Sequence, residues 1–137
     1  MSAVLVEKIL KAPSVADPLQ VVTQVLTEFD WESMGSRGSQ RQRHAVIAAN
    51  PGLLERDLAK QHLMAVGFVD ALRQRGVDAD VAQLAAGVGT HVFRTAYERW
   101  LGADDDTTLA TICASVMSDL SKIVPTGAAA SSSPPES

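Results

Sequence analysis

The segment from residue 79 to residue 101 constrains the fold most, because it is apolar on two sides. It reads ADVAQLAAGVGTHVFRTAYERWL and contains no proline, so its spacing predicts one long helix of about 35 Å. One apolar stripe of this helix holds Val81, Leu84, Val88 and Val92. The other stripe holds Ala82, Ala86, Gly89, Phe93, Tyr97 and Trp100. A helix with two apolar faces needs cover on both, which predicts a fold of packed helices.

The composition agrees with an all-α domain. The chain has 137 residues, of which 46% are apolar and only 4% aromatic, and alanine, valine and leucine dominate. This balance suits close-packed helices better than a sheet, which favours β-branched and aromatic residues. We expect one folded domain over residues 1–124. Residues 125–137 contain no apolar side chain larger than alanine, which predicts a disordered tail.

Proline, glycine and capping residues divide the chain into six predicted helices. Asp17 and Asn50 each precede a proline, and a capping side chain followed by proline is typical of a helix start. The link over residues 30–39 contains two glycines, and we expect its Trp31 and Met34 to fold back onto the core. The expected helices cover residues 3–11, 18–29, 40–49, 51–75, 79–101 and 107–124.

The two apolar stripes of the long helix, together with a third apolar stripe on the last helix, predict self-association. Six helices do not easily cover all three, so we expect the last two helices of two copies to form a four-helix bundle about a two-fold axis. The glycines inside the long helix favour this, since each costs about 1 kcal/mol relative to alanine unless a neighbour approaches closely. A monomer in which the other helices wrap the long one is the alternative. The expected interface is Val81, Leu84, Val88, Val92, Leu109, Cys113, Val116 and Leu120.

Charge and hydropathy exclude several classes of protein. The net charge of −4 does not fit a free-standing DNA-binding protein, which needs a basic surface for phosphates. The densest basic cluster, within residues 37–44, is typical of a solvated helix start. The sequence shows no secretory signal and no apolar run of the roughly 20 residues that a membrane span needs. We therefore expect a soluble, cytoplasmic protein without a membrane partner.

No motif for catalysis, a metal or a cofactor is present in the sequence. His44, His62 and His91 fall on different predicted helices without the spacing of metal ligands. Cys113 stands alone among apolar neighbours, which predicts a buried and inert thiol. We expect neither an enzyme nor a metal or cofactor site.

Three motifs carry a family resemblance: RHAVIAANPGLLER at 43–56, ALRQRGVD at 71–78 and FRTAYERWL at 93–101. In order and spacing they resemble the C-terminal regulatory domain of TetR/AcrR-type transcriptional regulators, over roughly residues 4–124. The resemblance implies a helical domain that binds a small, often apolar effector and dimerises through its last two long helices. In that family a helix-turn-helix unit precedes the domain. We find no such unit in this sequence. We therefore expect contact with DNA only through a helix-turn-helix unit outside these residues.

The resemblance also implies roles for individual residues. Large side chains on the second, fourth and fifth helices and on the link are candidates for an apolar or aromatic effector, although each also fits an ordinary core. These are Phe29, Trp31, Met64, Phe68, Phe93 and Tyr97. The helix at 40–49 corresponds to a segment that faces the DNA-reading units, so Arg41, Arg43 and His44 are candidates for interdomain coupling rather than plain solvated surface.

Two other functions stay open at this point. The chain fits a helical interaction module that forms mixed dimers with an intact relative, and less well a small helical enzyme. Subunit exchange with a relative distinguishes the first, and turnover distinguishes the second.

Overall fold

The computed structural model describes residues 2–13, 17–104 and 106–124, and within these ranges the chain forms six α-helices, one 3-10 turn and no strand. The predicted all-α class is therefore confirmed. The predicted tail at 125–137 lies outside the described residues. The elements are α1 (Ser2–Lys11), α2 (Pro18–Glu28), η1 (Trp31–Met34), α3 (Arg37–Ala49), α4 (Pro51–Gln74), α5 (Ala79–Leu101) and α6 (Leu109–Ile123).

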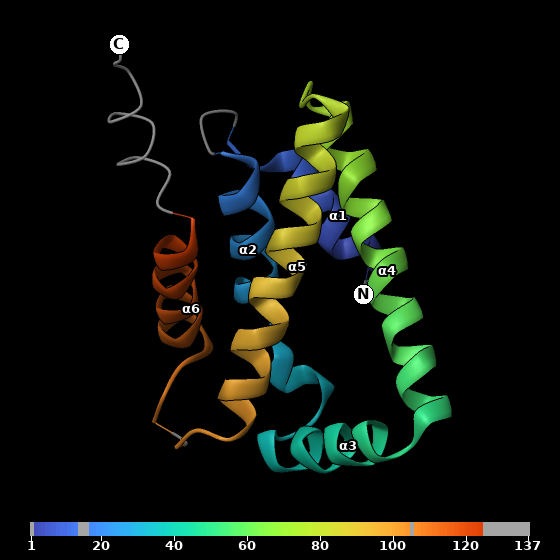
Figure 1. Ribbon diagram of the computed structural model, residues 1–137, viewed down its shortest axis with the longest axis vertical. Helices are drawn as coiled ribbons and strands as arrows, with labels where there is room; N and C mark the ends of the chain where they lie inside the picture. The colour runs from blue at the N-terminus through green and yellow to red at the C-terminus, as the bar shows by residue number, and fades with distance from the viewer. Residues whose placement is uncertain (1, 14–16, 105, 125–137) are drawn as a thin grey trace.

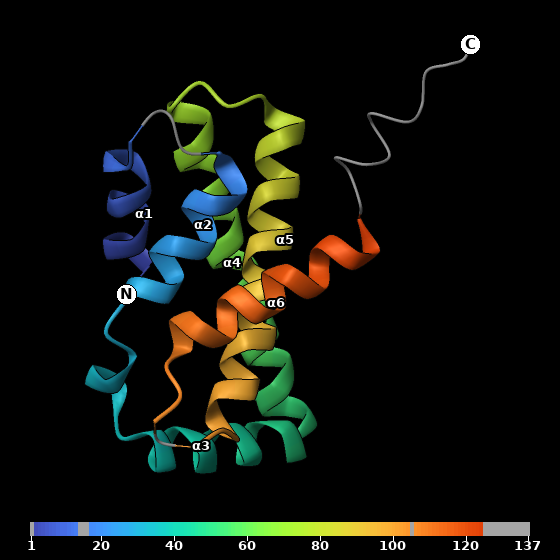
Figure 2. The same cartoon turned by 90° about the vertical axis from the view of Figure 1, so that its left-hand side faces the viewer.

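Helix α5 is the centre of the molecule. Helices α2, α4 and α6 pack against it, and α1 packs against α2 and α4 (Figure 1). Helix α3 runs across one end of α4 and α5, and α6 crosses α5 obliquely (Figure 2). The predicted second stripe of α5 faces this core, since all of its members are buried except Tyr97, which is half-buried. Besides this stripe, the most deeply buried large side chains include Leu5, Ile9, Val22, Leu26, Phe68 and Leu72.

Gly89 lets α2 approach α5 closely. A β-carbon built on Gly89 would lie 2.6 Å from Val22 Cγ1, closer than van der Waals contact permits. The glycine is therefore required by packing within one chain, so it no longer argues for a dimer. Gly87 has open space at the same position.

The predicted helix starts at Asp17 and Asn50 are confirmed by their hydrogen bonds, and Asp78 caps α5 in the same way. The Asp17 carboxylate accepts from the backbone N–H of Gln20 at 2.8 Å, and the Asn50 and Asp78 side chains accept from N–H groups of the next turn. Each cap satisfies donors that the first turn of a helix leaves unpaired.

Helix α3 begins at Arg37, earlier than the expected residue 40. Ser36 caps it by accepting from the Ser39 N–H at 3.1 Å, and Gly38 lies in the first turn without ending the helix. The break before α3 occurs instead at Gly35, whose φ of 125° is a conformation that side chains rarely adopt. Met34, expected to fold back onto the core, is exposed.

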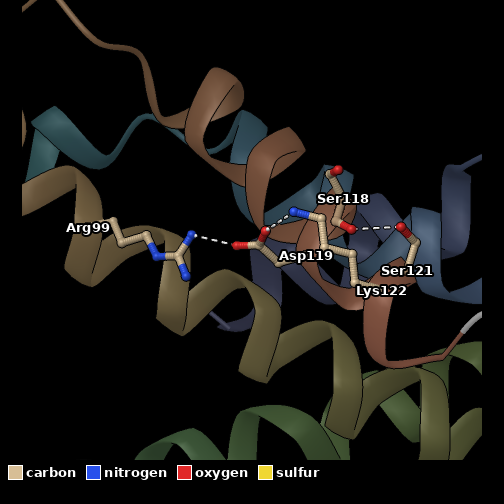
Figure 3. Close-up of polar contacts among 5 residues, drawn as sticks. All are labelled: Arg99, Ser118, Asp119, Ser121 and Lys122. Atoms are coloured by element: carbon tan, nitrogen blue, oxygen red, sulfur yellow. Dashed lines mark hydrogen bonds and ion pairs between the residues drawn. The ribbon is translucent and has the colours of Figure 1, made fainter.

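Helix α6, in contrast, begins later than the expected residue 107, at Leu109, where the Thr108 side chain caps it by accepting from the Thr111 N–H. Its far half is held to α5 by an ion pair: Arg99 donates to Asp119 at 3.1 Å, and Lys122 lies 3.4 Å from the same carboxylate (Figure 3). These hydrogen bonds hold the pKa of Asp119 below its ordinary value of 3.8. The stabilisation is thus present above that value and is lost as the pH falls through the lowered pKa.

Candidate effector site

Five aromatic side chains meet where the link after α2 packs on the second half of α5. We call them the aromatic cluster; they are Phe29, Trp31, Phe93, Tyr97 and Trp100. Trp31 lies at its centre, stacked on Phe93 at 5.0 Å between ring centroids and edge-on to Phe29 at 4.7 Å. Residues about 65 positions apart in the sequence thus form one aromatic surface.

Backbone and side-chain hydrogen bonds fix the central ring. Trp31 Nε1 donates to the carbonyl of Leu26 at 2.7 Å. The link that carries Trp31 is itself held by Gln40 of α3, whose Nε2 donates to the carbonyls of Trp31 and Gly35, both at 2.8 Å. Gln40 is buried, so these bonds and one from the Tyr97 hydroxyl to its Oε1 satisfy an amide that water does not reach.

The Tyr97 hydroxyl connects the aromatic cluster to α3. Burial raises the pKa of this phenol above its ordinary value of 10.0, and the nearby Arg43 partly offsets the effect of burial. The hydroxyl therefore stays protonated at neutral pH and donates to Gln40. This hydrogen bond joins α5 to the first half of α3.

A pocket of about 290 Å³ opens beside the cluster; we call it the aromatic pocket. Phe29, Trp31 and Trp100 form its aromatic wall, and Asp30 and Glu32 add two carboxylates. Its remaining lining comes from Thr27, Arg37, Thr107, Thr108 and Leu109. Most of the described lining residues are polar, so the pocket joins an aromatic wall to a polar one, and its volume lies at the small end of the range for small-molecule sites.

Arg37 closes one side of the aromatic pocket. Its guanidinium carbon lies 4.4 Å above the centroid of Trp100. Nη1 donates to the carbonyls of Ala103 and Asp104, the latter at 2.7 Å, and Nη2 donates to that of Thr107 at 3.0 Å. Arg37 thus ties the start of α3 to the link between α5 and α6.

Basic side chains along one face of α3 bind within the domain, where a solvated cluster was expected. Arg41 donates to the backbone carbonyl of Leu101, at the end of α5. His44 Nε2 lies 3.7 Å from the Glu98 carboxylate. Arg43 is exposed and lies near Tyr97. The residues predicted for interdomain coupling thus all lie next to the end of α5.

The structure brings together four of the six predicted effector residues. Phe29, Trp31, Phe93 and Tyr97 belong to the aromatic cluster. The other two lie on α4, where Phe68 is fully buried in the core and Met64 is half-buried against it; neither lines the aromatic pocket.

Sequence reasoning missed three residues of the site: Arg37, Gln40 and Trp100. Trp100 was placed on the second apolar stripe and not among the effector residues; it is buried, and its ring also lines the pocket. Its helical spacing from Phe93 and Tyr97 was the signal that placed it on the same face of α5. Arg37 and Gln40 carried no such signal. The carbonyls that Arg37 binds are distant in sequence, and those that Gln40 binds lie in the irregular link before α3.

The predicted dimer residues divide into two groups. Four are buried within the chain itself: Val92, Leu109, Cys113 and Val116. The other four are accessible, with Leu84 68% exposed, Val81 exposed, and Val88 and Leu120 half-buried. These four line a groove of about 470 Å³ between α5, α6 and the start of α2, with Leu19 and Met117 also in its wall; we call it the apolar groove.

The sequence matches no known family of proteins, and no curated protein is significantly similar to it. No helix in the described part of the chain has the length and hydropathy to cross a bilayer. Among the described residues, no three His, Cys, Asp or Glu side chains gather in a way that would hold a metal ion.

Proposed function

We propose that the chain is the effector-binding and dimerisation part of a TetR-like transcriptional repressor. The observation that carries this proposal is the aromatic cluster beside a pocket, tied by hydrogen bonds to a separate helix, α3. In the regulators that the sequence resembles, DNA is contacted by a helix-turn-helix unit. No such contact is proposed for these residues alone, whose net charge is −4.

The proposed effector is a small molecule with an aromatic or apolar body. It would lie against Phe29 and Trp31 in the aromatic pocket, whose volume of about 290 Å³ suits a molecule of two fused rings. Because the hydrogen bond to Leu26 holds the Trp31 ring in place, little ordering of the site is needed on binding.

The proposed dimer uses the apolar groove. Val81 and Leu84 are large apolar side chains exposed beside half-buried Val88 and Leu120, a contiguous apolar surface of the kind that marks an interaction site. A second copy would bring the same surface across a two-fold axis. An intact relative with a similar surface would fit it equally, which keeps mixed dimerisation as the second candidate.

The proposed coupling element is α3. A ligand that displaces the Trp31 side of the cluster also acts on Gln40, which holds both the link and Tyr97. Arg41, Arg43 and His44 lie on the same helix as Gln40, so a shift of α3 would move them together. Such a shift would give α3 the predicted interdomain role, because coupling between an effector site and a DNA-binding unit requires one element that responds to both.

Thermal unfolding with and without two-ring aromatic compounds tests the effector site. A ligand at 100 times its Kd stabilises the folded state by about 2.7 kcal/mol, which is readily measured as a rise in Tm. We expect Trp31→Leu to abolish that rise and Met34→Leu to preserve it, because Met34 is exposed in the same turn and does not line the pocket. Each variant is compared with its own ligand-free Tm. If no compound raises the Tm of the unmodified protein, the effector proposal fails.

A further inference from the structure

The charges in the aromatic pocket restrict which ligands it can hold. Two carboxylates, Asp30 and Glu32, line it together with one guanidinium, Arg37. Within residues 2–13, 17–104 and 106–124, no hydrogen bond or ion pair reaches either carboxylate. Asp30 precedes η1, yet its side chain makes no capping hydrogen bond there. Both residues are exposed, so their carboxylates are accessible to a bound ligand.

The Arg37 guanidinium is engaged in contacts within the domain. Its guanidinium donates to three backbone carbonyls of the link between α5 and α6 and covers the face of Trp100. An anionic ligand would have to displace these carbonyls while facing two carboxylates. The contact with Trp100 also shows that a cation packs stably on an aromatic face of this pocket.

We propose that the aromatic pocket binds an aromatic organic cation, such as a two-ring compound with a quaternary nitrogen. Its ring would pack against Phe29 and Trp31, because Arg37 already covers Trp100. Its positive charge would be attracted to those rings and to Asp30 and Glu32. Aromatic faces joined to carboxylates form the usual receptor for cations that cannot donate hydrogen bonds.

This inference rests on the proposed function in one respect: it takes the aromatic pocket to be the effector site. It adds the sign of the ligand's charge, which the aromatic cluster alone does not specify. An aromatic ring is required as well as charge, because a pocket of about 290 Å³ is much larger than a simple ammonium ion.

Three probes of nearly equal shape test the inference by isothermal titration calorimetry: N-methylquinolinium, neutral 1-methylnaphthalene and anionic 1-naphthoate. We expect the cation to bind at least about tenfold more tightly than the neutral probe, and the anion to bind most weakly. The double variant Asp30→Asn/Glu32→Gln should weaken cation binding about tenfold and leave the neutral probe unchanged.

The matched control is Glu55→Gln/Asp70→Asn, which removes one Glu and one Asp charge from exposed positions of α4 outside the pocket. It should bind all three probes as the unmodified protein does. Equal affinities for cation and neutral probe, preference for the anion, or equal loss of cation binding in both double variants would each overturn the charge assignment while leaving an aromatic effector site in place. Binding of none of the probes would overturn the proposed effector function itself.

Discussion

Gly89 shows how one missing side chain positions two helices. Val22, fully buried on α2, occupies the space that a β-carbon at residue 89 would need. Because α2 leads directly into Phe29 and Trp31, this close approach also sets where the aromatic cluster meets α5. Gly87 lies two residues earlier on the same helix and has nothing within 4 Å of its missing β-carbon.

We therefore expect Gly89→Ala and Gly87→Ala to change stability in opposite directions. Both gain up to about 1 kcal/mol of helix propensity. At residue 89 the clash with Val22 Cγ1, at 2.6 Å, costs about 1–3 kcal/mol because a packed core yields little. Urea unfolding at a concentration where the protein is monomeric should place Gly89→Ala below the unmodified protein and Gly87→Ala at or above it. Equal stabilisation of both variants would contradict the close packing of α2 on α5.

At the level of whole elements, α3 differs from the other helices because polar groups hold its first half. Gln40, Arg37 and Arg41 bind backbone carbonyls of neighbouring segments, and His44 lies beside Glu98. A helix held in this way can shift without exposing a large apolar face, which suits the coupling role proposed for it.

Tyr97→Phe should loosen α3 selectively. The change leaves Gln40 Oε1 buried without its donor, which costs about 1–3 kcal/mol. We expect faster amide hydrogen exchange in α3 and in the link before it, measured by mass spectrometry, with little change in α1. Arg99→Gln, two residues along α5, is the control: its ion pair with Asp119 holds α6, so any faster exchange should appear there (Figure 3). The same exchange pattern in both variants would show that Tyr97 has no special link to α3.

Sequence patterns predicted the helices well because their starts depend on local chemistry. Asp17, Asn50 and Asp78 cap helices through N–H groups two or three residues away, so the signal lies within a few positions. Helical spacing likewise placed Phe93 and Tyr97 on one face of α5. Contacts between residues that are far apart in the sequence leave no such local pattern and were not predicted.

The docking of α3 was missed because it is polar and distant in sequence. Arg37 and Arg41 bind carbonyls about 60 to 70 residues away, and from sequence such residues are indistinguishable from a solvated cluster. The position of Met64 and Phe68 was missed for a different reason. Whether side chains of α4 reach the aromatic cluster depends on how α4 leans away from α5 toward α3, a property of the whole fold (Figure 1).

At the scale of the whole molecule, the apolar groove is the feature that the single chain leaves unfilled. Helix α6 crosses α5 instead of running beside it, so the first half of α5 lacks cover on the side of Val81 and Leu84 (Figure 2). A dimer of this chain would therefore meet at the open groove rather than along the whole of α6, since Leu109, Cys113 and Val116 are already packed inside.

Leu84→Glu should dissociate the proposed dimer and leave the fold intact. Leu84 is 68% exposed in the single chain, so a carboxylate there stays hydrated, whereas in a dimer it would be buried without a partner. Light scattering coupled to gel filtration should give twice 14.5 kDa for the unmodified protein and 14.5 kDa for the variant. Leu63→Glu on α4 is the matched control, because Leu63 is also 68% exposed and does not line the groove.

The three outcomes of this experiment separate the possible interfaces. Dissociation by Leu84→Glu alone places the contact at the apolar groove, and dissociation by Leu63→Glu alone moves it to α4. A mass of 14.5 kDa for the unmodified protein at tens of micromolar removes the homodimer. An exposed apolar surface of this kind on a monomer marks an interaction site, so the apolar groove would then need a different partner. A mixed dimer with an intact regulator would become the favoured hypothesis.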